Sequence, residues 1–350
     1  MDPTDSGAEA PTPNTVPPVG FGVIGANSFV ANAAVLPAID AAVNSRLVAT
    51  ASRSSHVPER WRSTDVGSYE AVIAHPEVEA VYIPLPNGMH REWTERAAAA
   101  GKHVLCEKPL ASDVASATAM ATACTAAGVL LAEAWMTPFH RRYREVVRRA
   151  IAGDIGDVVA VDGSFRFTIG PEADGNYRWD PHQGGGALLD VGIYCLGAIV
   201  EIFGDHPETI RGTRVIRGGV DASTAAMLEY AGGRVGFIGC SFVDEPFQQL
   251  VIDGTLGTLA IATEAFTGGI DDTGYVHDTD PNVELSADTP PPTRNPDSEH
   301  TLHVDANDPY QSMIEAFADA VRGGSEWPRP VERSIEMLAL VERIKEATRD

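Results

Sequence analysis

The sequence predicts an α/β plus α+β protein, in which a doubly wound parallel sheet is followed by a largely antiparallel, open sheet. Over about residues 19–135, short apolar segments alternate with segments of helical character, and this alternation is typical of βαβ units. After Gly153, β-type segments follow one another with Gly and Asp turns and one helix between them, which favours an antiparallel sheet. A length of 350 residues is sufficient for two such domains.

Apolar β-type segments and helical segments alternate through the first domain. The expected strands are Val19–Ile24, Leu47–Ser52, Ala80–Pro84, His103–Cys106 and Val129–Ala132. The expected helices are Gly25–Ile39, Met89–Ala100 and a helix that runs from an N-cap at Ser112 to Ala127. Gly101 and Gly128 follow the last two helices, where glycine is common because it adopts positive φ without strain.

The second domain is expected to contain consecutive strands and one long helix, over about Gly186–Phe203. The strands are Val158–Thr168, Arg211–Arg217, Ala222–Tyr230, Arg234–Val243, Phe247–Asp253 and Gly257–Thr263. Residues 267–300 are polar, acidic and rich in proline, and they are expected to form a long surface excursion. Two helices close the chain: Pro309–Arg322, capped by Asn307 or Asp308, and about Val331–Arg349.

Charge and cysteine content exclude several classes of protein. The 26 basic and 49 acidic side chains give a net charge of −23, which argues against nucleic acids and membranes as partners. The 4 cysteines form no C-x-x-C pair, so we expect neither a disulfide framework nor a metal site. Residues 1–18 lack the basic and apolar regions of a signal peptide and are expected to be a disordered tail. We expect no segment to span a membrane, and the expected location is cytoplasmic.

The turn after the first strand, Gly25–Val30, has the position of a phosphate-binding turn. Gly25 fits the tight bend of a Rossmann turn, whereas Asn27 and Val30 stand where two further small residues are usual. The pattern alone also fits an ordinary strand–turn–helix. Because it opens a helix whose free N–H groups can hold phosphate, we expect Gly25, Asn27, Ser28 and Phe29 to bind a dinucleotide.

The end of the second strand predicts the choice of dinucleotide. NAD-preferring sites place a carboxylate here for the ribose 2′-hydroxyl, whereas an arginine suits a 2′-phosphate. Ser52 and Arg53 occupy this point, and residues 49–57 contain no Asp or Glu. The alternative is a solvated surface arginine. The sequence therefore favours NADP(H) over NAD(H).

Two further segments carry candidate catalytic residues. Lys108 follows a strand directly, at the edge where α/β sheets bind their ligands, although a strand-end lysine can also simply face water. Asp190 and Tyr194 are four residues apart in the expected long helix and therefore share one face. A carboxylate beside a phenol can transfer protons in alcohol–carbonyl interconversion. The alternative is a capping Asp and a core Tyr.

Taken together, these features resemble the glucose–fructose oxidoreductase/inositol dehydrogenase (Gfo/Idh/MocA) family. The resemblance covers about residues 19–260 and the closing helices. The segments that carry it are Tyr82–His90 (YIPLPNGMH), Ala100–Leu110 (AGKHVLCEKPL) and Asn176–Pro181 (NYRWDP) followed by three glycines. Tyr194, where inositol-dehydrogenase-like members tend to carry His, indicates the branch with dimeric dihydrodiol dehydrogenase, NADP-linked xylose dehydrogenase and deoxysugar ketoreductases.

The resemblance implies a role for each segment of the chain. Residues 19–135 would be the NAD(P)-binding Rossmann domain, residues 136–330 the substrate and oligomerisation domain, and residues 331–350 a closing helix. Lys108 and Tyr194 would be the catalytic pair, with Asp190 orienting a substrate hydroxyl or Lys108, whose positive charge would favour the Tyr194 phenolate. The residues expected around the ribose and nicotinamide are Pro84, Leu85, Asn87, His90, Glu107 and Lys108. Arg178 and His140 are substrate-side candidates, and the Lys108–Pro109 peptide bond is expected to be cis.

The predicted function is NADP(H)-dependent hydride transfer to or from a hydroxyl or carbonyl carbon of a sugar, polyol or diol. One alternative is a sugar-nucleotide ketoreductase of deoxysugar biosynthesis, which would use the same residues. Another is a non-catalytic NADP-binding regulator, although the presence of both Lys108 and Tyr194 argues against it. A homodimer or homotetramer formed through the second sheet is expected.

Overall fold

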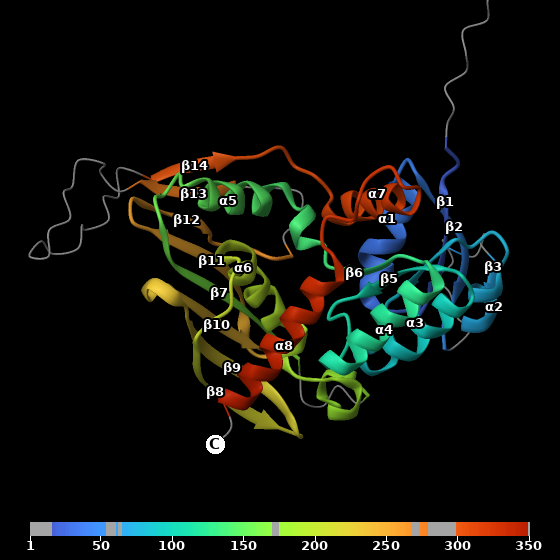
Figure 1. The fold of residues 1–350 in the computed structure, drawn as a ribbon, viewed down its shortest axis with the longest axis horizontal. Coiled ribbons are helices and arrows are strands. Elements are labelled where there is room, and N and C mark those ends of the chain that lie inside the picture. Colours follow the sequence, from blue (N-terminus) through green and yellow to red (C-terminus); the bar gives the residue numbers. More distant parts are fainter. Residues whose placement is uncertain are drawn as a thin grey trace, which may run out of the picture.

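The computed structural model describes residues 16–53, 61, 65–169, 175–267, 273–278 and 299–348. Two sheets lie side by side, each with helices packed against it (Figure 1). Most of the expected tail, residues 1–15, lies outside the described residues.

The first sheet has six parallel strands in the order β3-β2-β1-β4-β5-β6. Its strands are β1 Val19–Ile24, β2 Ser45–Ala51, β3 Asp65–Gly67, β4 Ala80–Ile83, β5 His103–Glu107 and β6 Leu131–Ala134. The strand order reverses between β1 and β4, and ligands bind doubly wound sheets at the carboxyl ends of such neighbouring strands. All residues of β1 are buried, because helices cover both faces of the sheet.

Helices from both ends of the chain cover the first sheet. They are α1 Leu36–Ala41, which continues from a π-helical turn over Ala31–Val35, α2 Tyr69–Ala74, α3 His90–Ala99, α4 Val114–Ala127 and α7 Pro309–Val321. Although α7 comes from the segment assigned to the second domain, it packs against α1 and β2, and its Phe317 ring lies 5.8 Å from that of Phe21. The N-cap expected at Ser112 is wrong: Asp113 caps α4, accepting a 2.7 Å hydrogen bond from the Ser116 backbone.

The second sheet has eight strands in the order β14-β13-β12-β11-β7-β10-β9-β8. Its strands are β7 Val158–Thr168, β8 Thr209–Arg217, β9 Val220–Glu229, β10 Val235–Ser241, β11 Val243–Gly254, β12 Gly257–Ile261, β13 Thr273–Asp278 and β14 Glu299–His303. Only β7 and β10, among the described strands of this sheet, pair in parallel. The predicted fold class, with a parallel sheet and a largely antiparallel one, is confirmed.

Five elements are not among those that the sequence predicts: β3, α2, α5, β13 and β14. Strand β3 has three residues and the neighbouring α2 has six, too short for a periodic signal. Helix α5, Arg141–Ala152, was missed although Tyr143, Val146, Val147 and Ala150 are buried at helical spacing. The expected surface excursion at 267–300 is partly wrong, because β13 and the start of β14 extend the second sheet from within it; residues 268–272 and 279–298 lie outside the described residues.

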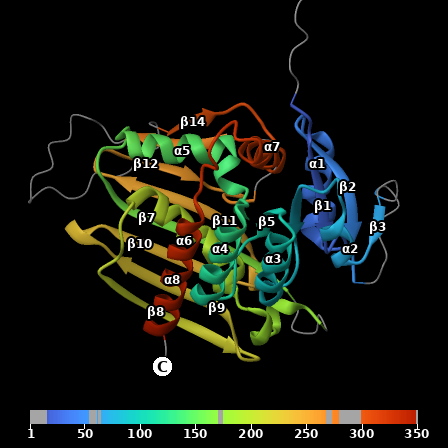
Figure 2. The same ribbon diagram turned by 45° about the vertical axis from the view of Figure 1, so that its right-hand side comes forward.

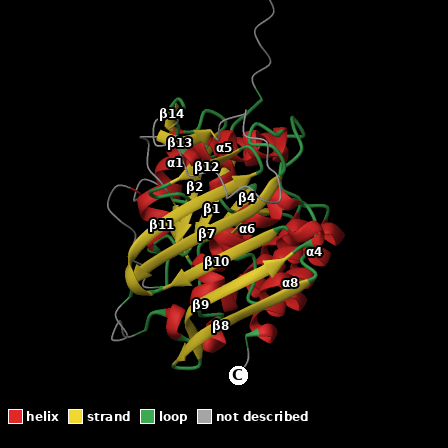
Figure 3. Ribbon diagram, turned by 90° about the vertical axis from the view of Figure 1, so that its left-hand side faces the viewer, coloured by secondary structure: helices red, strands yellow, loops and turns green. Residues whose placement is uncertain are grey.

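Within the described ranges, helices cover one face of the second sheet. Helices α5 and α6 (Ile193–Phe203) pack on this face, and α8 (Val331–Ala347) contacts α4 of the first domain as well as α6 and β8 of the second (Figure 2). No helix of the described part of the chain covers the opposite face (Figure 3). Among the described residues, Pro181–Phe203 is long and apolar enough to cross a membrane, but 89% of its apolar window is buried inside the protein.

Candidate active site

A cleft of about 610 Å³ opens at the carboxyl ends of the first sheet's strands, where β1 adjoins β2 and β4. It is lined by Gly25, Asn27, Ser28, Ser52, Arg53, Gly67, Ser68, Tyr69, Glu70, Pro84, Leu85, Pro86, Met89, Trp93, Gly175 and Tyr177. The cleft therefore brings together the turn after β1, the end of β2 and the Pro84–Leu85 segment, as expected for a dinucleotide site.

The turn after β1 requires glycine at its first position. Gly25 has φ +95°, and a Cβ there would lie 2.8 Å from a Leu85 methyl carbon. The Asn27 amide donates a 3.2 Å hydrogen bond to Ser52 Oγ, which links the turns after β1 and β2. Ser28 Oγ accepts from the Ala31 backbone N–H at 3.1 Å. Phe29, expected at the cofactor, is 87% exposed and lies outside the residues that line the cleft, because its side chain faces solvent.

One end of the cleft combines a cation with aromatic rings. Burial raises the pKa of Tyr69, and the neighbouring Arg53 opposes that shift through its charge and its backbone N–H. The rings of Tyr69 and Trp93 meet edge to face, with centroids 4.9 Å apart. Glu70 also lines this end but pairs with Arg96 at 3.2 Å. Sequence analysis missed Tyr69, Glu70 and Trp93, because β3 and α2, which bring two of them here, gave no periodic signal. The volume, the glycine turn and Arg53 fit a dinucleotide that carries a 2′-phosphate.

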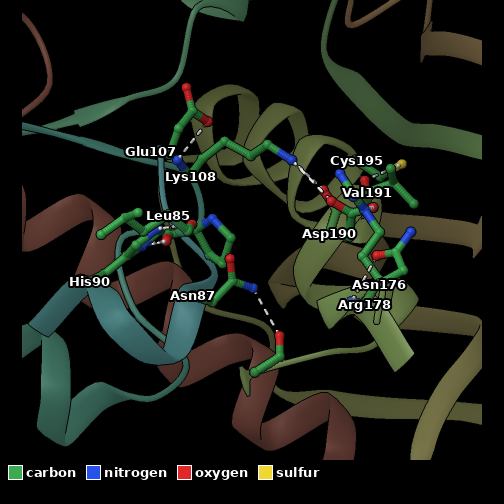
Figure 4. A network of polar contacts seen from close by, with 12 residues as sticks. Leu85, Asn87, His90, Glu107, Lys108, Asn176, Arg178, Asp190, Val191 and Cys195 are labelled. Carbon is green, nitrogen blue, oxygen red and sulfur yellow. Dashed lines mark hydrogen bonds and ion pairs between the residues drawn. The ribbon is translucent and has the colours of Figure 1, made fainter. Parts of the chain in front are cut away.

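Lys108 lies on the loop after β5, next to helix α6 and the turn before it (Figure 4). The Lys108–Pro109 bond is cis, as predicted. Lys108 Nζ donates a 2.8 Å hydrogen bond to the Asp190 backbone oxygen and lies 3.4 Å from its carboxylate. The same ammonium lies 4.8 Å from the centre of the Tyr194 ring. The structure thus brings the three proposed catalytic residues together.

Asp190 is 4% exposed and lies between two cations. Its second carboxylate oxygen accepts a 2.6 Å hydrogen bond from Arg178 Nε. Burial acts to raise the pKa of Asp190, but Lys108 and Arg178 outweigh it and hold the pKa below its usual range, so the carboxylate is ionised. Burial lowers the pKa of Arg178, yet Asp190 more than compensates and raises it.

A backbone feature fixes the helix that carries Asp190 and Tyr194. Its first turn, Leu188–Gly192, is π-helical, and the Leu188 N–H donates a 2.7 Å hydrogen bond to the buried Asp221 carboxylate. Gly186 has φ +120°, and a Cβ there would overlap the Asp221 carboxylate. This glycine therefore admits a neighbouring side chain of the protein.

Tyr194 is 5% exposed and surrounded by aromatic rings. The ring centroids of Phe165, Phe266 and Trp135 lie 5.4, 6.1 and 6.4 Å from its own. Burial, with Glu107 and Asp190, raises the pKa of Tyr194 well above its ordinary value. The expectation that Lys108 favours the phenolate therefore does not hold in this structure, because burial and two carboxylates disfavour the negative charge. The phenol is therefore neutral, and a neutral phenol can donate a proton.

Asn87 and His90 make hydrogen bonds to backbone carbonyls of other segments and are not among the residues that line the cleft. Asn87 is 4% exposed, and its amide donates a 2.8 Å hydrogen bond to Gly184 of the second domain. The His90 ring is fully buried, with nitrogens 2.8 Å from the Leu85 carbonyl and 3.0 Å from the Pro109 carbonyl. The ring ties the Pro84–Leu85 segment to the Lys108 loop (Figure 4), and the expected cofactor contact of His90 stays a prediction.

Two further tyrosines lie next to the residues of the site, and His140 is buried at the start of α5. His140, a substrate-side candidate, is 2% exposed and precedes α5. Tyr177 lines the cleft and lies beside Arg178, 4.9 Å from its guanidinium. Burial raises the pKa of Tyr310, at the start of α7, and the nearby Tyr194 and Glu107 add to the shift. Sequence analysis missed Tyr310, because nothing in the chain indicates that α7 returns to this site.

Glu107 is buried beside Lys108. It accepts a 2.7 Å hydrogen bond from the Tyr82 hydroxyl and a 3.1 Å bond from the Lys108 backbone N–H. Burial raises the pKa of Glu107 to about 7, against the opposing effects of Lys108 and Tyr82. This carboxyl therefore titrates near neutral pH.

The titration of Glu107 predicts a pH-dependent stability. The pKa of Glu107 is about 7 in the folded protein, against an ordinary value of 4.5, so protonation of this carboxyl stabilises the fold. This contribution to the unfolding free energy is fully present below pH 4.5 and is lost as the pH rises through 7. We expect the unfolding free energy of Glu107→Gln, relative to wild type, to increase by about 3 kcal/mol between about pH 4.5 and 8. Denaturant titrations at both pH values measure this difference, and other titrating groups cancel. Parallel pH profiles of the two proteins would contradict it.

Both domains match known families of protein sequences. Residues 19–134 match the family described as oxidoreductase family, NAD-binding Rossmann fold. Residues 140–260 match the family described as GFO/IDH/MocA C-terminal domain.

Similar proteins extend over nearly the whole chain. D-xylose 1-dehydrogenase (NADP(+)) 2 of Haloferax volcanii is 34% identical over 337 residues, which cover 93% of this chain and 96% of the relative. The dTDP-3,4-didehydro-2,6-dideoxy-alpha-D-glucose 3-reductase of Actinomadura kijaniata is 31% identical, with 97% and 98% covered. The crystal structure of a 3-ketoreductase from Actinomadura kijaniata in complex with NADP and TDP-benzene superposes with a TM-score of 0.82 at 29% identity, covering 95% of this chain and 98% of that one.

Proposed function

This chain belongs to the Gfo/Idh/MocA family and is an NADP-dependent oxidoreductase, and we propose that it acts on a hydroxyl or carbonyl carbon of a free sugar, polyol or diol. The resemblance that the sequence predicted is thereby confirmed, as are the enzyme class and the NADP preference. The observation that carries the proposal is the position of the Lys108 ammonium, 2.8 Å from the Asp190 oxygen and 4.8 Å from the Tyr194 ring centre.

The cofactor's site is proposed from the residues of the cleft. Gly25, Asn27 and Ser28 would hold the pyrophosphate, and Ser52 and Arg53 the 2′-phosphate. Pro84 and Leu85 would line the nicotinamide end of the cofactor: they line the cleft, and His90 ties Leu85 to the Lys108 loop, beside which Glu107 is buried. When bound, NADP(H) supplies or accepts the hydride.

The protein's own residues would handle the substrate oxygen and its proton. Lys108, held by Asp190, would donate a hydrogen bond to the reacting oxygen and stabilise negative charge on it. Tyr194 would give its proton to that oxygen during reduction and take it back during oxidation. Arg178 keeps Asp190 ionised and in place, and thereby fixes the direction of the Lys108 side chain. The aromatic rings around Tyr194 exclude water from the proton transfer.

The pairing of the site's cations supports a substrate without a diphosphate. Lys108 and Arg178 both contact Asp190, so their charges are already compensated. A nucleotide sugar brings a diphosphate that needs cations of its own. The rival proposal, a sugar-nucleotide ketoreductase, is supported by the similarity to the Actinomadura kijaniata 3-reductase. Two spectrophotometric assays distinguish the two proposals. One follows NADP⁺ reduction with aldoses, polyols and diols, and the other follows NADPH oxidation with dTDP-linked ketosugars. Turnover of the dTDP-linked compounds alone would reject our proposal.

Replacing Arg53 by alanine tests its proposed role. We expect the KM for NADP⁺ to rise about 10-fold, because one charge-assisted hydrogen bond to phosphate is lost, while the KM for NAD⁺ stays within about 2-fold. Arg46→Ala is a matched control, since Arg46 lies at the opposite end of β2 and pairs with Glu77. Steady-state kinetics with both cofactors measure the effect. Equal changes for NADP⁺ and NAD⁺ would rule out a 2′-phosphate contact.

The uncovered face of the second sheet is proposed to pair with a second copy of the chain. Phe237 of β10 and Phe247 of β11 are 38% and 42% exposed, and the small, exposed Ala225 of β9 stands opposite Gly239 of β10, so the surface is partly apolar. Light scattering is expected to give at least twice the mass of one chain. Phe237→Asp is expected to shift the protein toward the monomer without loss of folding. A monomeric wild type at micromolar concentration would contradict the proposal.

A further inference from the structure

Glu133 lies directly behind the loop that carries Lys108. It is the third residue of β6, beside Cys106 of β5, and is only 3% exposed. One carboxylate oxygen accepts a 2.9 Å hydrogen bond from the backbone N–H of Leu110, two residues after Lys108. A charged group is buried in a protein only when it is paired and hydrogen-bonded, so the Glu133 carboxylate needs partners besides the Leu110 backbone.

Those partners come from the other end of the chain. Ser334, in the first turn of α8, donates a 2.6 Å hydrogen bond to the second carboxylate oxygen. Arg329 Nε lies 3.5 Å from the same oxygen, and the Arg329 side chain is only 14% exposed. Burial lowers the pKa of Arg329, and Glu133 acts against this shift. The segment that leads into α8 therefore compensates the charge of Glu133 and fixes its orientation.

Arg329 also contacts Trp135, whose ring lies beside that of Tyr194. The Arg329 guanidinium lies 4.0 Å above the ring of Trp135, whose centroid is 6.4 Å from that of Tyr194. A Cβ on Gly197 would overlap this indole, so Trp135 packs directly on α6 next to the turn that holds Tyr194. Lys108 and Tyr194 are thus backed by one buried cluster, formed by Glu133, Trp135, Arg329 and Ser334.

We infer that Glu133 is a positioning residue for Lys108: its carboxylate, held by Arg329 and Ser334, fixes the Leu110 backbone and thereby the Lys108 ammonium against Asp190. The inference rests on the proposed roles of Lys108 and Tyr194. A displacement of about 1 Å of a reacting group can lower a rate about 100-fold. Loss of the hydrogen bond to Leu110 should therefore reduce turnover while leaving the turns after β1 and β2, which line the dinucleotide cleft, intact.

Two substitutions of similar size separate the hydrogen bond from the packing. Glu133→Gln keeps an oxygen that can accept from Leu110, and we expect kcat to fall less than about 10-fold. Glu133→Met fills the same space but removes the acceptor, and we expect kcat to fall about 100-fold, with the Kd for NADP⁺ changed less than about 3-fold. If the Met variant does not fold, the Gln variant still decides: a loss as large as that of Lys108→Ala would overturn the inference.

Glu79→Met is the matched control. The Glu79 carboxylate also accepts from a backbone N–H, that of Gly20 at 3.2 Å, and pairs with an arginine of the C-terminal segment, Arg322. It lies at the opposite end of the sheet, just before β4, so kcat should stay within about 2-fold.

A double variant distinguishes positioning from general loss of stability. If Glu133 acts through Lys108, Glu133→Met should have almost no further effect on kcat in a Lys108→Ala background. A second loss of about 100-fold in that background would mean that Glu133 acts independently of Lys108, and would overturn the inference.

A direct readout of Lys108 does not require a substrate. The chain has three lysines, Lys102, Lys108 and Lys345, so lysine labelled with ¹³C at Cε gives three side-chain NMR signals, assigned by the Lys108→Ala spectrum. In Glu133→Met the Lys108 signal should move while the Lys345 signal stays. In Glu79→Met the Lys102 signal should move, because Glu79 acts electrostatically on Lys102.

The NMR and kinetic results separate the two proposals. An unmoved Lys108 signal in Glu133→Met overturns the positioning role, whatever the kcat of that variant. Normal turnover by Lys108→Ala would instead overturn the proposed function, and a displaced Lys108 signal would still support the structural link from Glu133 to Lys108.

Discussion

Replacing Tyr194 by phenylalanine is expected to lower kcat by about 10²–10⁴, the usual contribution of a positioned general acid or base. The substitution keeps the ring and its packing against Phe165, Phe266 and the Lys108 ammonium. It removes only the hydroxyl, whose pKa burial raises well above its ordinary value and which we propose as the proton donor for reduction. Folding should survive, because at most one hydrogen bond worth about 1 kcal/mol is lost.

A second buried tyrosine provides the control for this experiment. Tyr143 is 1% exposed and its hydroxyl donates a 2.9 Å hydrogen bond to Glu201. Tyr143→Phe removes the same atom from the same domain, and kcat should stay within about 2-fold. Binding of NADPH, followed by its fluorescence, should be unchanged in both variants. If Tyr194→Phe also stays within a few-fold of wild type, the proton must come from elsewhere, for example from a water molecule held by Lys108.

The fold could be predicted wherever a pattern repeats within a short segment. The bounds of β1 and β7 agree with the expectation to the residue, because both are continuous β-type segments bounded by turns. Strand β3 has only three residues, and β13 lies in a polar, proline-rich segment, so neither has a pattern of its own. Helix α5 is different: its apolar positions follow helical spacing, and the periodicity was present but overlooked.

The site could be predicted only as far as local motifs reach. The end of β2 and the Lys108 loop each follow a strand, and strand ends meet at one edge of a parallel sheet. His90 lies in the Tyr82–His90 motif, and its ring nitrogens contact two backbone carbonyls. The sequence alone does not distinguish such contacts from a contact with a cofactor. The pairing of Glu133 with Ser334 spans 201 positions, and no local pattern specifies such a contact.

Replacing Lys108 by alanine is expected to lower kcat by about 10²–10³, as does loss of a donor that stabilises charge on a reacting oxygen. Without the ammonium, Asp190 still pairs with Arg178 and stays ionised. Its negative charge, which lies near Tyr194, then has one neighbouring cation in place of two. Lys102→Ala is the matched control. The Lys102 ammonium also donates to backbone carbonyls, at 2.7 and 3.1 Å, but at the opposite end of the sheet, and kcat should stay within about 2-fold.

Combining the two substitutions tests whether Lys108 and Tyr194 act as one unit. Because the ammonium and the phenol would serve the same oxygen in the same proton transfer, removing the second group should cost little once the first is gone. We therefore expect kcat of Lys108→Ala/Tyr194→Phe to lie within about 10-fold of the slower single variant. Independent roles would multiply the two losses and give a further decrease of at least about 100-fold. Such a result would assign Lys108 to substrate binding alone and leave Tyr194 as the only group of the pair that acts on the proton.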